Sequence, residues 1–133
     1  MKLILITLLG LVVGMMVACG GGGLQFANAQ EVVDSFNEFD VSSCQEQVYA
    51  MVGAESGLAC DFSQPGMTSS VGAEVYTYDG DAEKGCKDSG WWCRVSVDEA
   101  DSRGKNIIFS GNVMFVVFAG ADIANALLED LQT

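Results

Sequence analysis

The spacing of apolar residues changes along the chain, from a helical period near the N-terminal side to a period of two further on. Residues 29–39 predict a helix, because their apolar side chains recur at helical spacing and Asn28 and Glu31 have the capping-box pattern. A second helix is predicted over residues 44–52, with a Ser-x-x-Glu capping signal at its start and Gly53 at its exit. Val48, Met51 and Val52 would line one face of this helix. The first part of the domain is therefore expected to be helical.

Alternation with period two then predicts strands. Residues 71–78 and 91–97 alternate between apolar and polar types, and the polar segment 79–90 between them is expected to be a loop. Residues 106–118 are strongly β-forming, and they form either one long strand bulged at 110–112 or two strands joined by a turn there.

A final helix is predicted over residues 122–131, with Asp122 as its N-cap and apolar side chains along one face. Its last turn carries Glu129 and Asp130, which oppose the helix dipole, so we expect this end to fray. The order α-α-β-β-β(-β)-α predicts an α+β domain. In it, a small antiparallel sheet of three or four strands packs against N-terminal helices and a C-terminal helix.

The composition of the chain excludes several classes of function. A chain of 133 residues supports one domain, and 50% hydrophobic content argues against disorder. A net charge of −12 would repel a phosphate backbone, so nucleic-acid binding is not expected. The absence of histidine excludes Ser-His and Cys-His catalysis and zinc sites built on histidine, and no phosphate-binding glycine loop is present. We therefore expect no catalysis and no cofactor.

The N-terminal residues have the layout of an export signal. Lys2 precedes an uncharged apolar run over residues 3–18, which is typical of a signal peptide and short for a membrane-spanning helix. The sequence Met16-Val17-Ala18-Cys19 resembles the lipobox of bacterial lipoproteins, although that family usually has Leu, Val or Ile where Met16 stands.

The lipobox resemblance implies cleavage before Cys19, whose sulfur and amine would both carry lipid. Residues 1–18 are then the signal peptide, 19–27 a lipidated, glycine-rich flexible tether, and 28–133 the single domain. Gly20 in place of Asp implies the outer membrane if the cell is Gram-negative, and the Gram type stays open. The alternative is an ordinary signal peptide cut later, after Ala27 or Ala29.

Lipidation of one cysteine leaves an even set, Cys44, Cys60, Cys86 and Cys93, which suits two structural disulfides in an oxidising compartment. Their spacing lacks the close pairs of a four-thiolate zinc site. We favour Cys44–Cys60 and Cys86–Cys93, because each closes a short segment. Strand alternation leaves open that Cys93 reaches one of the first two cysteines instead.

Strand parity also predicts a candidate binding face. Tyr76, Tyr78, Trp92 and Arg94 fall on the side of the sheet away from Val75, and these residue types are enriched in binding hot spots. The alternative is that the first helix covers them.

The loop from Asp79 to Gly85 has oxygen ligands at alternate positions, like the start of a calcium loop. Lys84 and Gly90 stand where such a loop needs Gly and Glu. We therefore expect a solvated acidic loop and no metal site.

Charge is unevenly distributed, because residues 31–83 contain eleven acids and no Lys or Arg. Such a surface would attract a cationic partner. We expect a lipid-anchored binding or accessory protein of the cell envelope, attached to the membrane by its N-terminal lipid and contacting a protein partner. The alternatives are an inhibitor or immunity protein against a cationic envelope-attacking enzyme, and a small envelope hydrolase.

Overall fold

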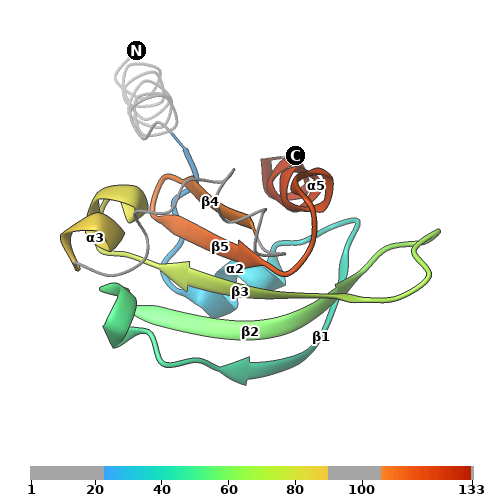
Figure 1. Ribbon diagram of the computed structural model, residues 1–133, viewed down its shortest axis with the longest axis horizontal. Helices are drawn as coiled ribbons and strands as arrows, with labels where there is room; N and C mark the ends of the chain where they lie inside the picture. The colour runs from blue at the N-terminus through green and yellow to red at the C-terminus, as the bar shows by residue number, and fades with distance from the viewer. Residues whose placement is uncertain (1–22, 90–105, 133) are drawn as a thin grey trace, which may run out of the picture.

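The computed structural model describes residues 23–89 and 106–132, which form an α+β fold (Figure 1). Within these residues one antiparallel sheet has the strand order β1-β2-β3-β5-β4. In chain order the elements are α2 (Ala29–Asp34), β1 (Asp40–Glu46), the 3-10 helix η1 (Ala50–Val52), β2 (Ser56–Ser63), β3 (Val71–Thr77), α3 (Ala82–Asp88), β4 (Asn106–Ser110), β5 (Val113–Val117) and α5 (Ala121–Gln132). The α+β class and the antiparallel sheet are confirmed, and the described sheet has five strands.

The larger core lies between one face of the sheet and helices α2 and α5. On β3, Val75 pairs with Leu58 of β2 and Phe115 of β5, so the three side chains lie on the same face. Val32 of α2 and Leu127 of α5 are buried against this face. Fully burying such a side chain contributes about 1.5–3 kcal/mol to stability.

A second, smaller core lies on the opposite face, under η1 and α3. Tyr76 and Met114 are buried there with Cys86 of α3 and Val52 of η1. Gly57 permits this packing, because a Cβ at Gly57 would stand 2.8 Å from the Tyr76 ring. The sheet is therefore covered on both faces at the end where β3 finishes.

The edge strand β1 is mostly exposed and is attached to β2 by a disulfide between Cys44 and Cys60, as predicted. A bulge interrupts the pairing between Ser42 and Gln45, and within it Ser43 has a φ of 55°, in the left-handed region. The bulge and the disulfide limit further pairing along this edge.

The last turn of helix α5 is held by hydrogen bonds, so the prediction that it frays is wrong. Asp130 is 5% exposed, and its carboxylate accepts hydrogen bonds from the backbone N–H groups of Asn37, Glu38 and Phe39 at 3.0–3.2 Å. Asp122 lies in the first turn and is not the N-cap, because the helix begins at Ala121.

Several predicted boundaries are wrong. Asn28 caps α2 as expected, but the helix stops at Asp34, where the Ser35 hydroxyl donates to the Glu31 carbonyl. Residues 44–52 form the end of β1 and the short η1 where a helix was predicted, and the following strand β2 was not predicted.

The segment 79–90 also differs from the prediction, because it contains α3 where a loop was expected. Residues 106–118 form two strands, as one of the two alternatives stated. Gly111, with a φ of 57°, and Asn112 form the turn between them. The predicted strand at 91–97 lies outside the described residues.

Candidate functional site

Tyr76 and Tyr78 lie on the face away from Val75, as strand parity predicts, but both side chains are buried at 4% exposure. The Tyr76 hydroxyl donates to Glu74 at 2.6 Å, and the Tyr78 hydroxyl donates to the Val52 carbonyl at 2.8 Å. Burial is the main cause that raises the pKa of both hydroxyls.

The two tyrosines therefore belong to the second core and are covered, although not by the first helix as the alternative stated. Their cover is η1 and α3, and the first helix packs on the opposite face. The other two residues of the predicted face, Trp92 and Arg94, lie outside the described residues.

The cysteines have one described pair, Cys44 and Cys60. Cys86 is buried in α3, with its Sγ 3.5 Å from the Met114 sulfur, and it is also disulfide-bonded. The predicted pairing of Cys86 with Cys93 and the predicted lipidation of Cys19 involve residues outside the described ranges.

The segment that resembles a calcium loop begins helix α3. The Asp81 carboxylate is the N-cap and accepts a hydrogen bond from the Lys84 N–H at 3.0 Å. Across residues 23–89 and 106–132, no group of three or more acidic, cysteine or histidine side chains is placed to hold a metal ion.

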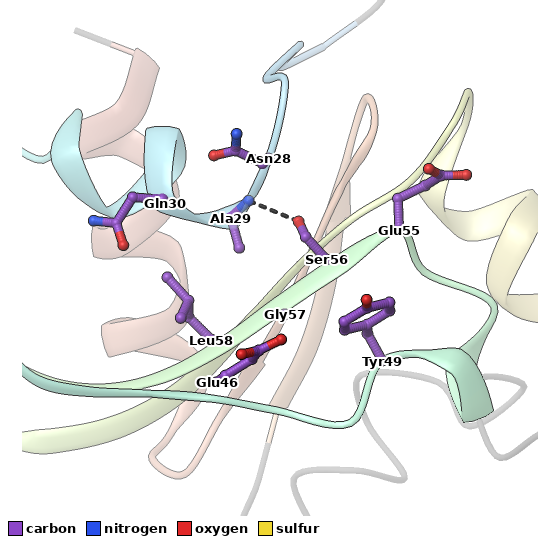
Figure 2. A pocket seen from close by; sticks show the side chains of 9 residues that line it. All are labelled: Asn28, Ala29, Gln30, Glu46, Tyr49, Glu55, Ser56, Gly57 and Leu58. Atoms are coloured by element: carbon purple, nitrogen blue, oxygen red, sulfur yellow. Dashed lines mark hydrogen bonds between the residues drawn. The ribbon is translucent and has the colours of Figure 1, made fainter.

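A surface hollow of about 220 Å³ lies where the start of α2 meets the ends of β1 and β2 (Figure 2). Gly57 and Ser56 line it, and the Ser56 hydroxyl accepts from the Ala29 N–H at 2.8 Å, which attaches α2 to β2. In Figure 2 the Glu46 carboxylate lies between Leu58 and the Tyr49 ring, on the side of the hollow away from α2. The remaining lining residues are Asn28, Gln30 and Glu55.

A second hollow lies beside the first and shares Glu46 and Tyr49 with it, so the tyrosine stands between the two. Val48, which lines this second hollow, is 71% exposed, and Met51 in η1 is 58% exposed, two of the largest apolar exposures in the described chain. We call the surface formed by Glu46, Val48, Tyr49, Met51 and Glu55 the Tyr49 patch. It combines apolar and aromatic side chains with two exposed carboxylates.

No described cation neutralises this patch. Lys84 and Lys87 are the basic side chains of the described ranges, and both belong to α3. Each is paired within that helix, Lys84 with Asp88 at 3.4 Å and Lys87 with Glu83 at 2.9 Å. Among residues 23–89 and 106–132, Glu46 and Glu55 therefore have no cationic partner.

Sequence reasoning missed the Tyr49 patch because it placed Val48 and Met51 on the buried face of a helix over residues 44–52. The residues form an open loop and η1 instead, and only Val52 of that apolar set is buried. The acidic run over residues 31–83 was the available signal, but it does not localise a site.

Comparison of the chain with protein-family models, with curated proteins and with solved structures finds no significant match. In the part of the chain that the structure describes, none of the helices has both the length and the apolar character needed to cross a membrane.

Proposed function

We propose that the protein is a lipid-anchored binding domain of the cell envelope, and that the Tyr49 patch contacts a cationic protein partner. The proposal includes no catalytic step and no cofactor. The observation that carries it is that acids which no described lysine pairs with lie at the same place as exposed apolar side chains. The lipobox-like sequence ending at Cys19 supports the anchor.

Charge supports a basic partner. The chain has 18 acidic and 6 basic side chains, and the two described lysines are already paired within α3. Such an imbalance steers positively charged proteins toward the surface and slows the approach of anionic ones. Glu46 and Glu55 then supply the charged rim of the contact, where an Arg or Lys side chain of the partner would be received.

The chemistry of the two hollows supports a protein partner. The hollow beside α2, of about 220 Å³, suits one inserted side chain, and the second hollow has about 440 Å³, which is within the range of roughly 300–1,000 Å³ typical of small-molecule pockets. Volume alone therefore does not select the partner, and the exposed side chains do. Tyr49 beside exposed Val48 and Met51 has the aromatic and apolar character found at the centre of binding hot spots.

An inhibitor or immunity protein against a cationic envelope-attacking enzyme is the second candidate, and the same acidic surface favours it. The two candidates differ in the partner, because an inhibited enzyme would lose activity when the protein binds. Turnover of wall or lipid substrates by the purified protein would instead favour the third class, a small hydrolase.

Site-specific photocrosslinking in intact cells tests the binding site. A photoreactive residue at Val48 should give a discrete adduct with a basic protein, and one at exposed Thr68 in the β2–β3 turn serves as the matched control. Equal adducts from both positions, or an acidic protein in the Val48 adduct, would contradict the proposed site.

A further inference from the structure

The chain just before α2 is fixed to the turn between β4 and β5. The Leu24 N–H donates to the Ser110 hydroxyl at 3.3 Å, and the Leu24 carbonyl accepts from the Asn112 N–H at 3.0 Å. The Asn112 side chain then pairs with the backbone of Phe26, accepting from its N–H at 2.9 Å and donating to its carbonyl at 2.6 Å. Leu24 and Phe26 are therefore both held against the β4–β5 turn by hydrogen bonds of their backbone groups.

The N-terminal segment and the β4–β5 turn are also closely packed against each other. Gly111 has no room for a side chain, because a Cβ there would collide with the Leu24 carbonyl. Asn112 is 6% exposed, and its amide also donates to the Tyr78 carbonyl at 3.2 Å, so one side chain joins the N-terminal segment, the β4–β5 turn and the end of β3. We call this arrangement of Leu24, Phe26, Gly111 and Asn112 the N-terminal clasp.

From this clasp we propose that the β4–β5 turn of the anchored protein lies against the membrane surface, and that the Tyr49 patch meets a basic partner located at that surface. The inference rests on the proposed lipid anchor at Cys19. Four residues lie between Cys19 and Leu24, and the five residue-to-residue steps that join them span at most about 18 Å. The clasp therefore cannot move farther than this from the lipid.

The Tyr49 patch shares the sheet end that contains the clasp. The Tyr78 N–H donates to the Asn112 carbonyl at 2.8 Å just after β3 ends, and Thr77 in the last position of β3 pairs with Ser56, the first residue of β2, beside Glu55. Figure 1 shows the β4–β5 turn, α3 and η1 gathered at this end. The patch is thus held near the bilayer by the same short connection.

The β2–β3 turn lies at the opposite end. It is separated from the clasp by the seven-residue β3, which corresponds to about 20 Å at the rise of an antiparallel strand. In Figure 1 this turn extends away from the N-terminal segment. We expect it to be the membrane-distal end of the domain.

Helix α3 also belongs to this end, because the Ala82 N–H donates to the Gly111 carbonyl at 2.8 Å. Its lysines, Lys84 and Lys87, are therefore at the end placed near the membrane.

Energy transfer from the protein to the membrane surface tests the orientation. The lipidated chain is placed in vesicles of phosphatidylethanolamine and phosphatidylglycerol that contain an acceptor dye on a headgroup. A fluorescent residue replaces either Asp79, next to the clasp, or Thr68, in the β2–β3 turn. We expect transfer several-fold stronger from position 79, and equal or stronger transfer from position 68 would overturn the proposal.

Two variants distinguish the effect of the clasp on orientation from the effect of the lipid anchor. Insertion of fifteen Gly and Ser residues between Gly22 and Gly23 should reduce the difference between the two positions, as should Asn112→Ala, which removes the side-chain pairing with Phe26. A difference unchanged in both variants would show that the clasp does not set the orientation. A chain that does not sediment with the vesicles would contradict the anchor itself, and the orientation with it.

Discussion

The carboxylate of Asp130 accepts hydrogen bonds from three successive backbone N–H groups, those of residues 37, 38 and 39. A negative charge in the last turn of α5 is unfavourable with respect to the helix dipole. The three hydrogen bonds offset this cost, because bonds to a charged acceptor contribute about 1.5–3 kcal/mol each. Asp130 thereby joins the last helix to the segment that leads into β1.

We predict that Asp130→Ala lowers the free energy of unfolding by about 2–4 kcal/mol, because it leaves backbone N–H groups near residue 38 without their acceptor. Urea denaturation measures the change. The neighbouring Glu129→Ala is the control, and since Glu129 is exposed it should change stability by less than about 0.5 kcal/mol. Equal effects of the two substitutions would contradict the role given to Asp130.

The buried tyrosines predict a loss of stability at high pH. Burial raises the pKa of Tyr76 and Tyr78 above the ordinary value of about 10, so the folded state holds its phenolic protons more tightly than the unfolded state. The stabilisation is complete below about pH 10 and is lost as the pH rises above that value. Circular dichroism should therefore show unfolding above about pH 10. In Tyr78→Phe, which cannot ionise at that position, the dependence should be shallower, and an identical pH dependence would contradict this assignment.

At the scale of elements, the sequence pattern predicted correctly a strand region that is buried on both faces of the sheet. Residues 106–118 predicted the β4–β5 region because β5 is buried along its whole length. Strand β1 could not be found in this way, because an exposed edge strand has no alternation, and its Ser-x-x-Glu sequence is also a helix-capping signal. The position of β1 depends on its pairing with β2. A local sequence pattern does not indicate that pairing.

Helix α3 was missed although its sequence carries a signal. Asp81 is an N-cap residue, and the buried Ala82 and Cys86 stand four positions apart on one helix face. The acidic and glycine-rich composition of the segment favoured a loop instead. Burial of Cys86 against Met114 supplies the tertiary contact that stabilises this short helix.

The Cys44–Cys60 disulfide should contribute to stability mainly by fixing the edge strand. We predict that the double substitution Cys44→Ala and Cys60→Ala lowers the free energy of unfolding by about 2–4 kcal/mol, as is typical of a bridge that closes a loop of this length. Urea denaturation and hydrogen exchange of β1 measure the effect. Unchanged protection of β1 in the double variant would contradict this role.

At the scale of the whole molecule, strand parity placed Tyr76 and Tyr78 on the correct face, yet it could not show what covers that face. Their cover comes from η1 and α3, elements that the sequence had assigned to a longer helix and to a loop. The Tyr49 patch was unforeseen for the same reason. A surface depends on how all elements pack, whereas the sequence pattern reports one element at a time.

The anchor is a prediction of the sequence, and it concerns the attachment of the whole domain. We predict that Cys19→Ser abolishes incorporation of labelled fatty acid and moves the protein from the membrane to the aqueous phase in detergent partitioning, since acyl chains dominate membrane affinity. Retention of Cys19→Ser in the detergent phase would contradict lipidation and would indicate that residues 3–18 remain as an anchor.

The central claim is that a cationic partner binds at the Tyr49 patch. Its most direct measurement is the affinity of a fluorescent peptide rich in Lys and Leu, determined by anisotropy over a series of salt concentrations. Glu46→Gln with Glu55→Gln should weaken binding about tenfold at low salt, or roughly 1.4 kcal/mol. The control with equal charge loss, Glu38→Gln with Glu129→Gln, alters exposed acids away from the patch and should change affinity by less than about threefold. Equal weakening by both pairs, or binding that does not depend on salt, would contradict the claim.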